Sequence, residues 1–201
     1  MEFKGWGRKP SGKRALFFLK FFKQELLLRE DGFICSIGLG NSQLFSIVED
    51  DIGIYYDAIV PSKLENLLSN YDFKSDSYLL KKATSAIDLI KKYQISKYNH
   101  APNIDDDYFS NATSNKVLII AQTKGDLSLE YGLAGRFNTS EIIDAAIEEN
   151  PNAEIYLKVH PDVLNGRKNS DIDIESVKEK CKIISDDVNP ISLLKHFSKV
   201  Y

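Results

Sequence analysis

Two polar segments in the second half of the chain carry residue types suited to group transfer. The first, residues 122–128, directly follows an apolar run. In it, Asp126 could act as a base, a nucleophile or a hydrogen-bond acceptor, and Gly125 permits a sharp turn or a close approach to a ligand. Gln122 and Ser128 offer neutral polar contacts that suit sugar hydroxyls. The alternative is a solvated turn in which Asp126 caps a backbone amide.

The second segment, Lys158-Val159-His160-Pro161-Asp162, follows another apolar run. Side chains alternate along an extended chain, so Lys158 and His160 are predicted to lie on one side, where they could bind a phosphate. The alternative is a histidine bonded to a backbone carbonyl beside a lysine in solvent. No metal site is predicted, because neither His100 nor His196 has ligand spacing to His160.

The N-terminal half offers two further candidates for binding a phosphate or an acceptor. Arg8 and Lys9 lie in a glycine-rich basic segment before a predicted helix, whose free amides would attract an anion. This segment lacks the residue order of a P-loop, and a flexible basic start explains it equally well. Glu30 and Asp31 could shift each other's pKa as an acid/base pair, or could simply be hydrated.

The elements that would position these residues differ between the two halves. After residue 116, strands and helices alternate, which favours a parallel α/β sheet with ligands beyond the carboxyl ends of its strands. The predicted ranges are strands 117–121, 154–159 and 182–184 and helices 140–148, 175–180 and 191–197. The last three residues resemble the start of another strand, so we expect a piece of a longer protein.

The first half mixes short strands and helices in a predicted domain 1–98, joined by a linker 99–115 to a domain 116–201. Its predicted elements are helix 13–24, strand 25–29, a hairpin of 45–48 and 52–56, and helices 61–68 and 77–93. The phenylalanines of helix 13–24 favour packing in the core. The basic character of this helix leaves a membrane-surface role as the alternative.

Bulk composition is that of a soluble globular protein, with 201 residues, 43% hydrophobic and 27% charged. The net charge of −3 gives no general attraction to nucleic acid, which is not expected as a partner. Cys35 and Cys181 provide neither metal-ligand spacing nor a disulfide framework, as suits a reducing cytoplasm. No apolar run reaches the roughly 18 residues of a membrane span.

In order, several segments closely resemble the bacterial capsule polysaccharide synthesis family of β-Kdo (3-deoxy-manno-octulosonic acid) transferases. They are Gly5-Trp6-Gly7-Arg8-Lys9, Glu30-Asp31-Gly32-Phe33, Ser36-Ile37-Gly38-Leu39-Gly40, Gly53-Ile54-Tyr55-Tyr56-Asp57, Pro61-Ser62-Lys63-Leu64-Glu65, Ile95-Ser96-Lys97-Tyr98-Asn99, Gln122-Thr123-Lys124-Gly125-Asp126-Leu127-Ser128 and Lys158-Val159-His160-Pro161-Asp162-Val163.

The resemblance implies a cytoplasmic enzyme at the inner face of the bacterial inner membrane, in contact with capsule assembly and export proteins. Its fold would be a two-lobed GT-B-like glycosyltransferase, here an N-terminal acceptor-side lobe plus an incomplete Rossmann-like donor-side lobe. The donor would be CMP-Kdo, and the acceptor would be Kdo on a lysophosphatidylglycerol anchor. No cofactor is implied.

By the same resemblance, Asp126 matches the catalytic acidic residue, and net retention makes it the nucleophile. Lys158 and His160 would hold the CMP phosphate. Cys35 stands where the family usually has arginine, which would remove a bidentate contact. Two alternatives stay open: a degenerate, non-catalytic module that binds glycolipid or a partner, and another CMP-sugar transferase of the sialyltransferase type.

Overall fold

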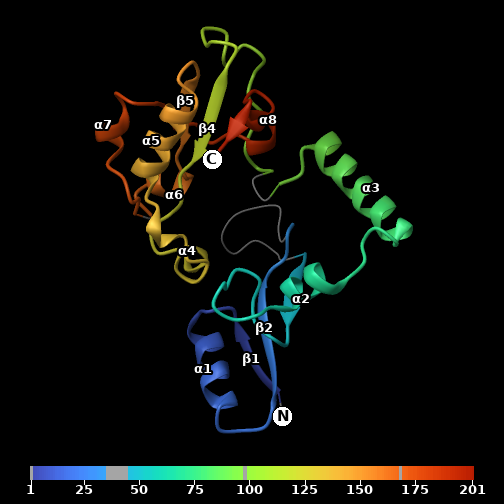
Figure 1. The fold of residues 1–201 in the computed structure, drawn as a ribbon. Coiled ribbons are helices and arrows are strands. Elements are labelled where there is room, and N and C mark those ends of the chain that lie inside the picture. The colour runs from blue at the N-terminus through green and yellow to red at the C-terminus, as the bar shows by residue number, and fades with distance from the viewer. Residues whose placement is uncertain (1, 35–44, 97–98, 168) are drawn as a thin grey trace. The chain divides into compact units, whose positions relative to one another are not determined.

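The computed structural model describes residues 2–34, 45–96, 99–167 and 169–201. It divides into two compact units (Figure 1). Unit 1 comprises residues 1–97 and 127–134, and unit 2 comprises residues 98–126 and 135–201. The chain therefore returns to unit 1 for eight residues directly after Asp126, which the sequence pattern did not predict.

Unit 1 contains a three-stranded sheet in the order β1-β2-β3. β1 (Glu2–Trp6) runs parallel to β2 (Glu25–Asp31), and α1 (Pro10–Leu19) connects them. β3 (Ile47–Asp50) pairs antiparallel with β2. Proline in the first turn suits the start of α1, because its missing N–H is not needed there. The core of this unit is formed by Ala15, Leu26, Leu28 and Ile54.

The predicted hairpin of 45–48 and 52–56 is wrong, because a carboxylate takes the amides that a second strand would use. Asp50 is 1% exposed. Its side chain accepts hydrogen bonds from the backbone N–H groups of Ile52 (2.8 Å), Gly53 (2.9 Å) and Lys63 (2.8 Å). Hydrogen bonds between a side chain and nearby backbone amides compete with the hydrogen bonds that would pair two strands. They therefore stabilise an irregular turn here.

The prediction that the phenylalanines of helix 13–24 pack in the core is also wrong, and the helix itself ends at Leu19. The first turn of α1 approaches β1 so closely that a Cβ on Gly5 would lie 2.4 Å from Gly12 Cα. Gly12 and Ala15 therefore occupy the buried face of the helix, and the phenylalanine rings of α1 and of the turn after it remain exposed. Their exposed fractions are 54% for Phe17, 43% for Phe18, 67% for Phe21 and 54% for Phe22.

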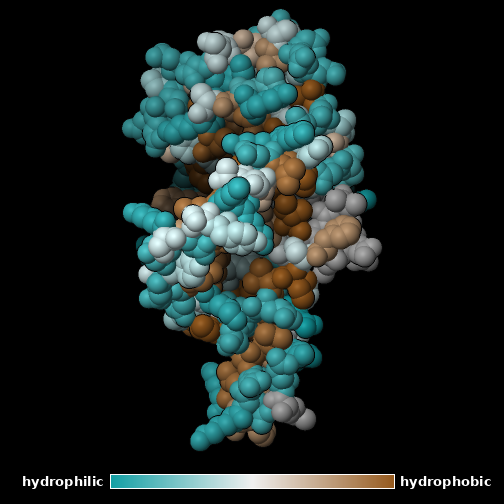
Figure 2. Space-filling view, turned by 90° about the vertical axis from the view of Figure 1, so that its right-hand side faces the viewer, coloured by the Kyte–Doolittle hydropathy of each residue, from teal (hydrophilic) through white to brown (hydrophobic). Residues whose placement is uncertain are grey.

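Three more helices belong to unit 1. α2 (Lys63–Asn70) and α3 (Ser77–Tyr93) are capped by the side chains of Ser62 and Asp76, and α4 (Leu127–Tyr131) is short. The predicted bounds of α3 are confirmed, although none of its residues is buried. Figure 2 shows a face of the surface on which hydrophilic residues are interspersed with apolar patches. Across the described residues, we find no helix with both the length and the apolar character of a membrane span.

Unit 2 is built on a four-stranded parallel sheet in the order β6-β5-β4-β7. Its strands are β4 (Lys116–Ile120), β5 (Glu154–Lys158), β6 (Lys182–Ile184) and β7 (Lys199–Val200). Its helices are α5 (Thr139–Glu149), α6 (Pro161–Leu164), α7 (Ile174–Val177) and α8 (Pro190–Leu194), and η1 (Ala134–Arg136) lies where the chain passes from unit 1 back into unit 2. In chain order the strands read third-second-first-fourth, as in half of a Rossmann sheet. The predicted α/β class with a parallel sheet is confirmed.

Both faces of this sheet are covered, as continuous apolar strands require. Val117, Ile119 and Leu157 pack on one face with Ile143 of α5. Leu118, Tyr156 and Ile184 pack on the other face with Leu193 of α8 and with Ile104. The segment 99–115, which we expected to be a linker, thus belongs to unit 2 and covers a face of its sheet.

Candidate functional site

The carboxyl ends of β4, β5 and β6 lie at one edge of the sheet of unit 2. β4 ends at Ile120, β5 at Lys158 and β6 at Ile184. β4 has β5 on one side and β7 on the other, so the strand order reverses next to it. In open α/β sheets this switch point is where ligands bind. The loop that carries Asp126 starts there.

Backbone pairing with residues 169–170 holds this loop in place. Thr123 is 8% exposed and forms an antiparallel bridge with Ser170. Lys124 N donates to Asn169 O at 3.0 Å. The loop is therefore braced from a distant part of the sequence.

The loop then turns sharply, so that Asp126 follows at the surface. Gly125 has φ +85°, a left-handed conformation that favours glycine. Asp126 N donates to Thr123 O at 3.3 Å across this turn. Asp126, Gly125 and Gln122 are all exposed. Ser128, the last candidate of this segment, is exposed in α4 and belongs to unit 1.

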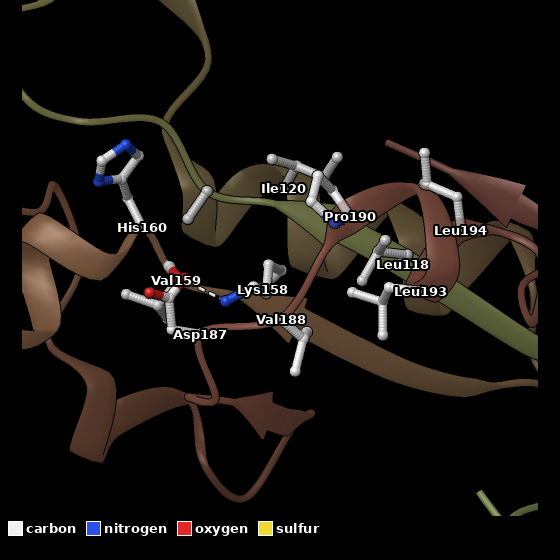
Figure 3. Close-up of a pocket in the computed structure, with 11 residues that line it drawn as sticks. Leu118, Ile120, Lys158, Val159, His160, Asp187, Val188, Pro190, Leu193 and Leu194 are labelled. Carbon is white, nitrogen blue, oxygen red and sulfur yellow. Dashed lines mark hydrogen bonds between the residues drawn. The ribbon is translucent and has the colours of Figure 1, made fainter. Parts of the chain in front are cut away.

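A cavity of about 140 Å³ opens at the same edge of the sheet, beside α8 (Figure 3). Its lining is mainly apolar, with Lys158, His160 and Asp187 as the charged or ionisable members. Lys158 and His160 both line this cavity, as does Val159 between them. Gln122, Gly125 and Asp126 are not among the residues that line this cavity.

Lys158 is held by backbone carbonyls. Its Nζ donates to Asp186 O at 2.7 Å. It also donates to Val159 O at 3.4 Å, the hydrogen bond that is dashed in Figure 3. Burial lowers the pKa of Lys158 below its ordinary value, while the carboxylates of Asp187 and Asp186 oppose that shift. The ammonium therefore braces the loop between β6 and α8 at the edge of the cavity.

The hydrogen bond to His160 defines which ring nitrogen can donate when the imidazole is neutral. Nδ1 accepts from the backbone N–H of Asp162 at 3.1 Å. The neutral tautomer compatible with this bond carries its proton on Nε2. The side chain is 19% exposed, so a ligand in the cavity can reach it.

Asp186 and Asp187 belong to this region and were missed in the sequence. Asp187 lines the cavity and lies 3.7 Å from His100 Nε2. The Tyr108 hydroxyl donates to the Asp186 carboxylate. Burial and this hydrogen bond together raise the pKa of Tyr108 above its ordinary value. Both aspartates follow β6, so the rule that led to Asp126 and His160 could have identified them.

The phosphate-binding candidate Arg8 forms a shielded ion pair in unit 1. Its guanidinium contacts the carboxylate of Asp57, and their side chains are 13% and 0% exposed. Asp57 also accepts from Ile59 N at 2.8 Å. The Arg8 backbone N–H donates to the Tyr56 hydroxyl at 2.8 Å. Arg8 is therefore bound to the protein itself.

Glu30 joins the same cluster. It accepts from Trp6 Nε1 at 2.7 Å. A Cβ on Gly7, where φ is +36°, would lie 2.3 Å from the Tyr56 hydroxyl oxygen and 2.4 Å from a Glu30 carboxylate oxygen. Only glycine fits there. Burial raises the pKa of Tyr56 to about 12, although the hydrogen bond with Arg8 N opposes the shift.

The remaining two candidates of unit 1 are at the surface. Lys9 is exposed, with Nζ 5.5 Å from the centre of the Trp6 ring. Asp31 is exposed at the end of β2. Cys35, where the resemblance expects arginine, lies outside the described residues.

Segment 127–134, directly after Asp126, is anchored on this cluster. Ala58 N donates to Tyr131 O at 2.9 Å. The Arg8 guanidinium carbon lies 5.2 Å from the centre of the Tyr131 ring, and Lys13 Nζ lies 5.6 Å from it. Tyr131 thus receives one hydrogen bond and two cation–π contacts from unit 1.

Comparison with known proteins places this geometry in a family. Residues 4–201 match the model of the family described as "Capsule polysaccharide biosynthesis protein". The capsule polysaccharide modification protein LipA of Neisseria meningitidis serogroup A is 42% identical over 201 residues, which cover 98% of this chain and 28% of LipA. The lipopolysaccharide-processing protein LpsZ of Rhizobium meliloti is 33% identical over 86% of this chain and 40% of LpsZ.

Two solved structures are also similar. KpsC of Thermosulfurimonas dismutans, described as a beta Kdo 2,4 transferase, gives a TM-score of 0.87 at 40% identity, over 98% of this chain and 61% of that one. A second KpsC structure, described as a beta Kdo 2,7 transferase, gives a TM-score of 0.65 at 28% identity, over 100% of this chain and 57% of that one. The chain therefore spans only part of these relatives, and it belongs to the capsule polysaccharide biosynthesis protein family.

Proposed function

We propose that this chain is part of a retaining glycosyltransferase that moves β-Kdo from CMP-Kdo to a lipid-linked Kdo acceptor during capsule biosynthesis. The similar KpsC structures are described as beta Kdo transferases, which supports the chemistry. The observation that carries the proposal is the position of the Asp126 loop at the switch point of the sheet, next to the strand that ends in Lys158. The working location is the inner face of the bacterial inner membrane.

Retention follows from two displacements. The Asp126 carboxylate attacks the anomeric carbon of Kdo, and the bond from that carbon to the CMP phosphate oxygen breaks, so that CMP leaves with the electron pair. An acceptor hydroxyl then attacks the same carbon and passes its proton to water, while the bond from that carbon to the Asp126 oxygen breaks and the carboxylate leaves with the electron pair. Each step inverts the centre, and the product keeps the β configuration.

His160 and Lys158 act on the departing phosphate in this proposal. The Nε2–H of His160 donates to a phosphoryl oxygen, and the Lys158 ammonium supplies positive charge close to it. Gln122 and Gly125 of unit 2 contact the donor through a polar side chain and a close backbone approach. No cofactor takes part.

The proposed lobes follow the GT-B plan. Unit 2 supplies the donor side, and unit 1 supplies the acceptor side. In unit 1, Lys9 and Asp31 are exposed and available to an acceptor, whereas Arg8 and Glu30 act through the cluster they stabilise.

The test uses the full gene product with CMP-Kdo and a synthetic Kdo glycolipid. Asp126→Asn is expected to lower the transfer rate by more than about 10³-fold, the scale seen for lost nucleophiles. Intact-mass analysis should detect one added Kdo on the wild-type protein without acceptor and none on the variant. Asp105→Asn, in an exposed turn, is the matched control.

Other outcomes would replace the proposal. Glycolipid binding without transfer would identify a non-catalytic binding module. Transfer from a different CMP-sugar in preference to CMP-Kdo would identify another transferase. Full activity of Asp126→Asn would remove the nucleophile from this position.

A further inference from the structure

Four phenylalanines form an exposed aromatic surface on α1 and the turn that follows it. This phenylalanine surface consists of Phe17, Phe18, Phe21 and Phe22, each at least 43% exposed. The rings contact one another, with centroid distances of 5.1 Å for Phe17–Phe21 and 5.6 Å for Phe17–Phe18. Phe18 and Phe22 also contact Phe3 of β1. The rings thus form one contiguous patch.

The four phenylalanines are not among the buried core residues of unit 1. α1 packs on the sheet through Gly12 and Ala15, which are buried. Clustered exposed aromatic rings are unfavourable in water, and contiguous apolar patches of this kind mark interaction sites.

The charges around the patch identify the partner. Residues 10–24 contain no aspartate or glutamate and four cations: Lys13, Arg14, Lys20 and Lys23. All four are exposed. Binding to an apolar surface of another protein would not require this excess of positive charge.

We propose that the phenylalanine surface docks on an anionic lipid bilayer. The rings enter the boundary between headgroups and acyl chains, and the four cations meet lipid phosphates. Aromatic residues inserted at the membrane interface, with lysine and arginine at the level of the headgroups, are typical of a peripheral membrane anchor. The inference needs only unit 1 and does not depend on transfer activity.

The first experiment measures sedimentation of the 201-residue chain with vesicles. Binding is expected to vesicles of 70% phosphatidylcholine and 30% phosphatidylglycerol, to weaken with added salt, and to be much lower with phosphatidylcholine alone. Phe17→Ser/Phe21→Ser and Lys20→Glu/Lys23→Glu should each lower the affinity by at least about tenfold.

Matched controls separate the surface from general charge and hydrophobicity. Phe137→Ser removes a phenylalanine that is 70% exposed in unit 2. Lys74→Glu/Lys195→Glu makes the same charge change at exposed positions elsewhere. Both should bind vesicles like the wild type.

A second measurement does not depend on a loss of binding. In Phe21→Trp, the added indole should be quenched by brominated phosphatidylglycerol vesicles, whereas that of Phe137→Trp should not. Absence of vesicle binding, equal binding to both vesicle types, or quenching only at position 137 would overturn the proposal. So would concentration-dependent dimerisation lost in Phe17→Ser/Phe21→Ser without vesicle binding, since a second copy would then be the partner.

Discussion

At the residue scale, the role of Arg8 is determined by the carboxylate with which its guanidinium pairs. Sequence alone placed Arg8 in a basic segment suited to an anionic ligand. In the structure its charge is matched by Asp57, whose side chain is fully buried. Removing one member of such a pair leaves an uncompensated charge, whereas replacing both can be neutral.

Arg8→Ala is expected to lower the free energy of unfolding by about 3–5 kcal/mol, the usual cost of breaking a buried pair. Urea unfolding followed by circular dichroism measures it. The exposed neighbour Lys9→Ala should change stability by less than about 0.5 kcal/mol. Arg8→Leu/Asp57→Leu should recover a large part of the loss. Equal stabilities of Arg8→Ala and Lys9→Ala would contradict the buried-pair account.

The raised pKa of Tyr56 predicts that the stability of the folded protein depends on pH above neutrality. Its pKa is about 12 in the folded protein and about 10 in an unfolded chain. Between those values the folded state retains a proton that the unfolded state has released, so this contribution to stability falls as pH rises. The stability gap between the wild type and Tyr56→Phe should therefore be constant below pH 10 and narrow toward pH 12.

Urea midpoints measured from pH 8 to 12 check this. Tyr78→Phe removes a hydroxyl from a side chain that is 75% exposed and serves as the control, with a gap expected to stay constant. A Tyr56→Phe gap that widens with pH would have the wrong sign for a raised pKa.

At the element scale, the predictable parts are those whose pattern repeats. α3 and the strands β4, β5 and β6 were recognised because helical or continuous apolar spacing persists over several residues. β1 was missed because its five residues, EFKGW, include two charges and a glycine. The role of Asp50 depends on three amides that only folding brings to it, and the exposure of the phenylalanines depends on how closely α1 approaches the sheet.

The candidate site could be proposed from the sequence only where it adjoins such a pattern. Lys158, His160 and the Asp126 loop were singled out because each lies at or soon after the end of an apolar strand. Asp186 and Asp187 could have been found in this way, since they follow β6. The pairing of Arg8 with Asp57 joins positions 49 residues apart and leaves no local signal.

Substitution of Asp50 tests whether its carboxylate holds the turn that follows β3. Asp50→Ala removes the acceptor of three backbone amides and should lower the free energy of unfolding by at least about 2 kcal/mol, because buried donors lose their partner. Asp51→Ala removes only an exposed ion pair with Lys63 and should cost less than about 1 kcal/mol. Thermal or urea unfolding measures both. Similar losses for the two variants would show that the buried turn is not held by this carboxylate.

At the scale of the whole molecule, the two units are not separate stretches of sequence. The chain leaves unit 2 after Asp126, contributes residues 127–134 to unit 1 and returns. The residue proposed as nucleophile is thus followed directly by a segment that unit 1 holds. Tyr131 contacts unit 1 in two ways: its carbonyl accepts a hydrogen bond, and its ring makes two cation–π contacts.

Tyr131→Ala should therefore loosen segment 127–134 without unfolding either sheet. Two cation–π contacts of about 0.5–1 kcal/mol each correspond to roughly tenfold faster opening. Hydrogen exchange measured by mass spectrometry should show faster exchange in residues 127–134 and at Ala58, with β4 and β5 unchanged. Tyr131→Phe keeps the ring and should exchange like the wild type. Faster exchange throughout both units would mean that Tyr131 supports global stability, and unchanged exchange would mean that its ring does not anchor the segment.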